Sequence, residues 1–398
     1  MESPPEISGA LASSTTEWVQ RFVRSGDAES PVNILDLDEI VHSYDRWKDS
    51  HPYAGAYYLP SVNNHPTVLT LLGKLGLGFS CASVIEMRSV LKNGVTPDRI
   101  VLAHPAKAPE TILYAKQKDI RRIVCDSVQE IGKVHRLYPT AHIILRIRVL
   151  AGQKFGCCPT DGVREIFNYA ASAGVTIAGI HVAVPQNGAL DEVATLRRAL
   201  QIVKDSIDQA SKAGLSDIRQ LILSGTESVS AEQLQHTLAE FDVAATLHII
   251  IETERQLVQS AVTLITSVQS KRVIRQAGTS GPVQEIMYFI NDGRYGSFEW
   301  WNAVDKHPVI FRANSTVSTA ASTHPSSLWG PSCDSADIVC ERLELPELEI
   351  GDYLVFPAMG AYGVTLASCF NGFPIPKTVA CARLETTRAL VEGSLSDV

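Results

Sequence analysis

Two stretches decide the fold, His142-Ile-Ile-Leu-Arg-Ile-Arg-Val149 and Thr176-Ile-Ala-Gly-Ile-His-Val-Ala-Val184. Each is a short run of mostly β-branched and other apolar residues. Strands buried on both faces of a parallel sheet have this composition, because helices cover the sheet on each side. The two runs therefore predict buried parallel strands.

The same alternation continues outward in both directions, from Val32 to Val258. About eight β/α repeats in about 220 residues favour a (β/α)₈ barrel of the TIM type, with a doubly wound sheet as the alternative. The predicted strands are Val32–Leu37, Gly55–Leu59, Arg99–Ala103, Arg122–Cys125, His142–Val149, Thr176–Val184, Gln220–Leu223 and Leu247–Ile251.

After Arg255 the pattern changes to short strands separated by turns rich in Gly, Pro and Ser, which is typical of a β-domain. The segment Asn314–Ser327 is rich in Ser and Thr and reads as a mobile surface loop. We therefore expect an N-terminal extension (1–31) that contributes to the β-domain, a barrel domain (32–258) and a C-terminal β-domain (259–398). The predicted β-strands are Val262–Val273, Glu285–Ile290, Val309–Arg312, Asp352–Phe356 and Thr378–Arg383.

Composition excludes several classes of protein. The chain has 398 residues, 45% of them hydrophobic, and a formal net charge of −8. This supports a real core and argues against a nucleic-acid partner, while no apolar run is long enough to cross a membrane. No basic region followed by an apolar one begins the chain, and the eight cysteines contain no CxxC pair. These features predict a reduced, cytoplasmic protein.

Common catalytic motifs are missing. The glycines of Gly73-Lys-Leu-Gly-Leu-Gly78 have the wrong order for a dinucleotide loop and read as a helix end and turn. The sequence contains no Walker loop, GxSxG elbow or HExxH helix. Asp36 and Asp38 follow a strand and are expected to cap the next helix rather than bind a metal, so no metal site is predicted.

Four segments are dense in Gly, aromatic and small polar residues: Asn291-Asp-Gly-Arg-Tyr-Gly-Ser-Phe298, Trp329-Gly-Pro-Ser-Cys-Asp334, Met359-Gly-Ala-Tyr362 and Phe370-Asn-Gly-Phe373. Together they resemble the eukaryotic ornithine decarboxylases, which are fold-type III, pyridoxal-phosphate (PLP)-dependent enzymes. The resemblance runs from about Val32 to Phe373. It implies an alanine racemase-like architecture, a barrel plus a β-sandwich or β-barrel domain, and a head-to-tail dimer with sites at the interface. The resemblance also includes Gly78-Phe-Ser-Cys-Ala-Ser83, Pro97-Asp-Arg-Ile-Val101, Leu145-Arg-Ile147 and Lys154-Phe-Gly156.

The resemblance fails at the positions that hold the cofactor. In Tyr57-Tyr-Leu-Pro-Ser-Val-Asn63, Ser61 occupies the position of the family's lysine, and a hydroxyl cannot form a Schiff base. A divergent member that binds no PLP is therefore predicted. The other departures are Ser80 for an aspartate, Ala183 for a histidine, Gln186 for a serine, Ser224-Gly225-Thr226 for three glycines, and Glu252-Thr-Glu-Arg255 for E-P-G-R.

Other polar positions are kept, and the resemblance implies their roles. Glu252 matches the carboxylate that pairs with the pyridine nitrogen, Cys333 a proton donor, and Asp334 a group that binds the substrate's distal ammonium; these are the predicted catalytic residues. A second amine-binding aspartate falls near Val304 or Asp305. Lys154 and Asp337 match an inter-subunit ion pair, which predicts a homodimer.

The predicted ligand-binding residues are Arg146, Arg255, Tyr362, His181 and Ser61. Each has a simpler interpretation as well. Arg255 could form an ordinary ion pair, Cys333 could be a packing thiol, and His181 could be a core histidine that faces the same side of its strand as Ala183.

Three functions remain open. The favoured hypothesis is an enzyme that works without PLP on an amine or a cyclic imine or iminium, as in alkaloid metabolism, with Glu252, Cys333 and Asp334 stabilising the cation and moving protons. The alternative is an inactive regulator that forms a heterodimer with an active ornithine decarboxylase or sequesters a regulatory protein, as antizyme inhibitors do. The third is a small-molecule sensor.

Overall fold

The computed structural model describes residues 13–25, 30–185, 191–243, 245–276, 281–299, 308–311, 322–385 and 387. The chain divides into two compact units. One is formed by residues 44–256, and the other by the residues up to Ser43 together with Leu257–Ala389. In the described residues, no helix is both long and apolar enough to cross a membrane.

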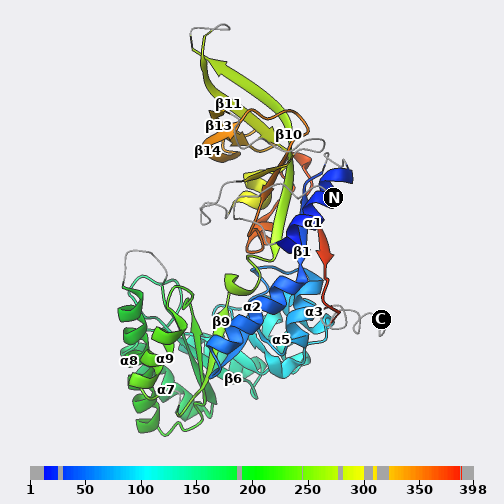
Figure 1. Cartoon of the computed structure of the whole chain (residues 1–398). Helices are drawn as coiled ribbons and strands as arrows, with labels where there is room; N and C mark the ends of the chain where they lie inside the picture. Colours follow the sequence, from blue (N-terminus) through cyan, green and yellow to red (C-terminus); the bar gives the residue numbers. More distant parts are fainter. Residues whose placement is uncertain are drawn as a thin grey trace. The chain divides into compact units, whose positions relative to one another are not determined.

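The first unit is a closed barrel of parallel strands, as predicted, so the doubly wound alternative is excluded. Figure 1 shows α7, α8 and α9 side by side on its outside. Its strands are β2 (Ala54–Tyr58), β3 (Gly78–Cys81), β4 (Ile100–Leu102), β5 (Arg122–Cys125), β6 (His142–Ile147), β7 (Ile177–Ala183), β8 (Gln220–Ser224) and β9 (His248–Thr253). The helices are α2 (Leu37–Ser50), α3 (Pro66–Lys74), α4 (Val84–Lys92), α5 (Pro109–Gln117), α6 (Val128–Leu137), α7 (Asp161–Ala173), α8 (Glu192–Lys212) and α9 (Ala231–Glu240).

Local sequence explains where these helices begin. The side chains of Ser83, Ser127, Asp191 and Ser230 each accept a hydrogen bond from the N–H three residues on, which satisfies a main-chain donor that the helix itself cannot. Asp36 does the same for α2 by accepting from two N–H groups of its first turn, as predicted. Inside the barrel, one apolar cluster fills the space between the strands: Tyr57, Val101, Val124, Ile144, Ile222 and Ile250.

One predicted barrel strand is wrong. The run Val32–Leu37 forms β1 (Val32–Asp36), which pairs with β10 and β16 of the other unit. A barrel domain that starts at residue 32 therefore starts too early, because β1 belongs to the sheet. All five residues of β1 are buried, so its composition matches that of a barrel strand. The barrel strand missing from the prediction is β3, which is short and begins with glycine.

The second unit contains a mixed sheet in the order β12-β15-β10-β11-β13-β14, joined by β1 and β16. Figure 1 shows β10 and β11 as a long antiparallel pair. In α1 (Ser13–Ser25), Val19 and Val23 pack against the sheet. The remaining strands are β10 (Val262–Arg275), β11 (Val283–Ile290), β12 (Val309–Phe311), β13 (Thr323–Trp329), β14 (Ile338–Pro346), β15 (Tyr353–Phe356) and β16 (Lys377–Cys381).

The predicted loop Asn314–Ser327 is wrong in its described part. Residues 323–327 belong to β13, which pairs with β11 and β14. Serine and threonine there fill strand positions, and Ser326 and Ser327 are buried. Conversely, the predicted turn at Gly73–Gly78 is confirmed, because α3 ends at Lys74 and Gly76 has a φ of 97°.

Candidate functional site

Four polar side chains meet inside the barrel, near the carboxyl ends of consecutive strands. Arg146 lies on β6, His181 on β7, Ser224 on β8 and Glu252 on β9. Arg146, Ser224 and Glu252 each come two residues after an isoleucine of the interior cluster, so they face inward as well. In TIM-type barrels this end of the strands carries the catalytic groups.

A chain of hydrogen bonds joins the four. The Ser224 hydroxyl donates to Glu252 Oε2 and lies 2.7 Å from His181 Nε2. Arg146 Nη1 lies 3.4 Å from His181 Nδ1 and 3.2 Å from its Nε2. His181 and Glu252 are almost completely buried, with 1% and 5% exposed. The network is therefore shielded from bulk water, where electrostatic interactions are strong.

Burial fixes the charge of His181. It lowers the pKa of the imidazole well below its usual value, and the neighbouring Arg146 lowers it further. The ring is therefore neutral at pH 7. Because the single Ser224 proton goes to Glu252, the Ser224 oxygen accepts from His181 Nε2–H. These two donors thus point in one direction, from His181 toward Glu252, while Arg146 Nη1 lies within 3.4 Å of both ring nitrogens.

Two buried oxygens at this end of the barrel have no hydrogen-bond partner among the described residues. They are Oε1 of Glu252 and the hydroxyl of Ser80. Ser80 pairs in register with the interior residue Val101 and therefore faces inward too. Because buried polar atoms in native proteins are nearly always satisfied by protein or by ordered water, these two oxygens are positions where a water or a polar ligand would be held.

Arg255 follows β9 and is paired with Glu227. Its Nε and Nη2 atoms lie 3.1 and 3.0 Å from Glu227 Oε2. Glu227 Oε1 also accepts from the main-chain N–H groups of Glu254 and Arg255, at 3.2 and 2.8 Å. Arg255 thus forms the ion pair that was its simpler interpretation.

Ser61 lies in the turn that follows β2. Its side chain is exposed and makes no hydrogen bond to the described part of the chain. The structure therefore does not join Ser61 to the network of Arg146, His181 and Glu252. Gln186, Val304 and Asp305 lie outside the described residues.

Cys333 and Asp334 share a loop of the other unit. The N–H of Cys333 donates to Asn371 Oδ1 at 3.1 Å, and its thiol side chain is exposed. Asp334 accepts from Ala336 N–H and from the Tyr295 hydroxyl, at 3.0 and 2.5 Å, and these bonds lower its pKa. Tyr362 lies in the same unit, with a φ of 60°.

Two carboxyl groups beneath this loop were not predicted as site residues. Asp337 is 1% exposed, and its two oxygens accept from the N–H groups of Arg294 and Ser332. Asp292 accepts from Gly293 and Ser297 N–H through Oδ1, while its Oδ2 is buried without a partner in the described residues. Burial raises the pKa of Asp292 to about 6. In this chain Asp337 holds two turns together.

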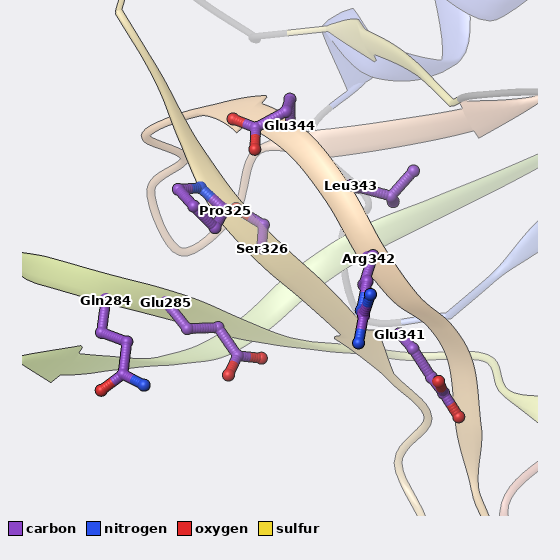
Figure 2. A pocket seen from close by; sticks show the side chains of 8 residues that line it. All are labelled: Gln284, Glu285, Pro325, Ser326, Glu341, Arg342, Leu343 and Glu344. Carbon is purple, nitrogen blue, oxygen red and sulfur yellow. The ribbon is translucent and has the colours of Figure 1, made fainter.

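A separate hollow of about 590 Å³ lies on the sheet, over β11, β13 and β14. Figure 2 shows its eight lining side chains, which include Glu285 and Arg342. The Glu285 carboxylate already accepts from Ser327. No unpartnered buried atom lines the hollow, so it gives no comparable sign of a bound molecule. Among the described residues, no group of three or more His, Cys, Asp and Glu side chains could hold a metal ion.

The structure thus brings together three of the predicted residues, Arg146, His181 and Glu252. In the sequence, Ser80 and Ser224 stand out only as departures from a family pattern, and Glu227 belongs to none of the motifs described above. A signal for Ser224 was available, because it lies two residues after Ile222 and so shares its face.

Comparisons with known proteins agree with this architecture. Residues 37–267 match the family described as "Pyridoxal-dependent decarboxylase, pyridoxal binding domain". The chain is 33% identical over 368 residues to the chloroplastic ornithine decarboxylase of Nicotiana glauca, covering 87% of this chain and 82% of the relative. It is 31% identical over 387 residues to antizyme inhibitor 2 of Xenopus laevis, covering 92% and 84%.

Solved structures give the same result. The arginine decarboxylase of Paramecium bursaria Chlorella virus superposes with a TM-score of 0.83 at 25% identity, covering 92% of this chain and all of that one. The lysine/ornithine decarboxylase of Vibrio vulnificus, solved with putrescine, superposes with a TM-score of 0.79 at 25% identity, covering 93% and 99%.

Proposed function

Because this chain belongs to the family of pyridoxal-dependent ornithine/arginine decarboxylases, we propose that its barrel is a descendant of their active site that works without PLP. In this proposal it binds a cationic amine or a cyclic imine in its protonated, iminium form, and it moves a proton on that molecule. The observation that carries the proposal is Oε1 of Glu252, a buried carboxylate oxygen with no partner among the described residues.

The residues present do not fit PLP. The resemblance assigns Ser61 to the position of the cofactor lysine, and a hydroxyl cannot form an imine with an aldehyde. Arg255 and the N–H groups beside it, which would receive the phosphate, are engaged by Glu227. These features support a site whose chemistry comes from the chain's own side chains.

Glu252 suits an iminium ion. Its Oε2 is fixed by Ser224, so Oε1 is held in place to meet a positive charge in a site of low dielectric constant. In the proposed step the carboxylate removes a proton from the carbon next to C=N⁺. The electrons of that C–H bond form a C=C bond, and those of the C=N π bond return to nitrogen, giving a neutral enamine. The reverse step returns the proton.

The neighbouring groups assist without changing charge. Neutral His181 donates to Ser224, which donates to Glu252, so both hydrogen bonds stabilise the ionised carboxylate. Arg146 stays charged although burial lowers its pKa, because Glu252 and Asp126 raise it. The network therefore orients Glu252, while its Oε1 is left to contact the ligand.

The test is exchange of the carbon-bound protons of 2-methyl-1-pyrroline with D₂O, followed by NMR against the uncatalysed rate. We expect the wild-type protein to accelerate exchange and Glu252→Gln to reduce that acceleration by about 100-fold or more, because general-base catalysis is lost. Glu341→Gln, at an exposed carboxylate of the other unit, is the control. Acceleration that survives in Glu252→Gln would overturn the proposal.

A second function is favoured by a different observation, the 31% identity to antizyme inhibitor 2 over 92% of this chain. In that case the chain would regulate polyamine synthesis by binding an antizyme-type protein or an active ornithine decarboxylase. The absence of catalysed exchange, together with co-purification of one of these partners, would select this function.

A further inference from the structure

We infer that Glu227 is an internal anion that occupies the barrel's anion site and so excludes ligands that carry a phosphate. This inference adds to the proposed function a class of ligand that the barrel excludes, namely phosphorylated molecules. It rests on the proposed function only for the ligands that the barrel accepts, the amines and imines. The inference rests on four hydrogen bonds that the Glu227 carboxylate accepts from Glu254 and Arg255, directly after β9.

The four contacts use both oxygens of Glu227. Oε2 accepts from two nitrogens of the Arg255 guanidinium, at 3.1 and 3.0 Å, and Oε1 accepts from two main-chain N–H groups, at 3.2 and 2.8 Å. The Glu227 side chain is 8% exposed and that of Arg255 is 27% exposed. A partly buried carboxylate with four donors is held firmly in place, since bonds to a charged acceptor are about twice as strong as neutral ones.

The backbone explains why the carboxylate reaches this position. Gly225, directly after β8, has a φ of 70°, and a Cβ there would lie 2.1 Å from the carbonyl oxygen of Val184. Only glycine fits such a turn without strain. The turn redirects the chain immediately after Ser224 and places Glu227 beside the end of β9.

Without Glu227 the same donors would form an anion site. A guanidinium with two adjacent N–H groups is the arrangement that binds phosphate in many proteins, because it offers one full positive charge and several directed donors. The intramolecular carboxylate competes for these donors at a high effective concentration. A phosphate would in addition meet the negative charge of Glu227 at close range.

The consequence is a selective barrel. In the proposed function a small cation faces Glu252, while the neighbouring anion site is filled from within. The ligand is therefore an unphosphorylated amine or imine, and a phosphorylated cofactor or sugar is excluded by charge rather than by size.

The experiment measures binding of inorganic phosphate by calorimetry at constant ionic strength, in the wild type and in Glu227→Gly and Glu227→Gln. We expect saturable binding by Glu227→Gly and at least about tenfold weaker binding by the wild type, with Glu227→Gln intermediate because its amide oxygen still accepts hydrogen bonds. Pyridoxal phosphate and pyridoxal are then compared, and only the phosphorylated molecule should gain affinity.

Two further variants make the result specific. Glu240→Gln removes a bidentate pair with Arg197 on α8 and α9 and should not create phosphate binding. The double variant Glu227→Gly/Arg255→Ala should lose the phosphate binding that Glu227→Gly gains. Saturable phosphate binding by the wild type, equal to that of the variants, would overturn the inference, as would a gain that persists without Arg255. Because binding is measured directly, neither result depends on whether the imine exchange reaction occurs.

Discussion

At the scale of single residues, Asp292 shows how a buried carboxyl group makes stability depend on pH. Its Oδ1 accepts two main-chain N–H bonds, yet burial dominates, assisted by the nearby charge of Asp337, and raises the pKa to about 6. The folded protein therefore holds this proton more tightly than the unfolded chain, whose carboxyl has a pKa of 3.8. Ionisation of Asp292 opposes folding.

The sign follows directly. Below about pH 3 the carboxyl is protonated in both states, and its ionisation does not affect stability. Between about pH 3 and 7 the unfolded state loses its proton first, so stability falls as the pH rises, by about 3 kcal/mol in all. We expect Asp292→Asn to remove this dependence. The free energy of unfolding of the variant minus that of the wild type should therefore increase by up to about 3 kcal/mol between pH 4 and 7.

Urea unfolding at intervals across this range measures the difference. Asparagine keeps an acceptor oxygen for Gly293 and Ser297 N–H, so any constant cost of the substitution is separated from the part that varies with pH. A difference between the two proteins that stays the same from pH 4 to 7 would show that Asp292 does not titrate as described.

At the scale of elements, β3 illustrates what a sequence pattern can and cannot predict. The long β-branched runs of β6 and β7 predicted barrel strands because helices bury them on both faces. β3 is short and contains glycine and serine at interior positions, so its pattern carries little hydrophobic signal. β1 has the apolar composition of a barrel strand but belongs to the sheet. The strands with which it pairs, β10 and β16, lie far along the chain, so its local sequence does not identify them.

The glycine that weakened the prediction is required by packing. A Cβ on Gly78 would lie 2.2 to 2.5 Å from the ring of Tyr57 on the neighbouring strand β2. That ring fills the barrel core, with the Arg122 guanidinium 5.2 Å from its centre. Close packing leaves no room for the ring to move aside.

We therefore expect Gly78→Ala to lower the free energy of unfolding by about 1–3 kcal/mol, the usual cost of overpacking a core. Gly55→Ala on β2 is the matched control: its Cβ would meet the His248 ring at 3.6 Å, which is ordinary contact, and its effect should stay within about 0.5 kcal/mol. Urea unfolding measures both. Equal effects of the two substitutions would contradict the packing argument.

The candidate site was harder to predict than the fold. Arg146, His181 and Glu252 could be proposed because each follows a buried strand pattern and a family motif. Glu227 could not, since its role depends on a turn that brings the residues after β8 back to the end of β9. Likewise, that Oε1 of Glu252 lacks a partner is a property of the packed barrel and of no local motif.

At the scale of the whole molecule, the division into two units separates two kinds of surface. The barrel holds its polar network inside, whereas the sheet unit presents apolar side chains on the segment after Tyr362. Leu366, Phe370 and Phe373 are 49%, 43% and 38% exposed, and the Phe370 ring centre lies 4.5 Å from that of Tyr295. Tyr295 in turn donates to Asp334, so the exposed aromatics adjoin the Cys333–Asp334 loop.

Exposed aromatic clusters of this kind mark contact surfaces, and we expect a second copy of the chain to cover this one. Sedimentation velocity should give about 87 kDa, twice the chain mass of 43.3 kDa. Phe370→Ser should shift the protein toward the monomer, because aromatic anchors carry much of the energy of an interface. Val379→Ser, at an exposed apolar residue of β16, should leave the dimer intact. A monomeric wild type that instead pairs with an added ornithine decarboxylase would contradict the homodimer and support the regulatory function, since the same surface would then serve a different partner.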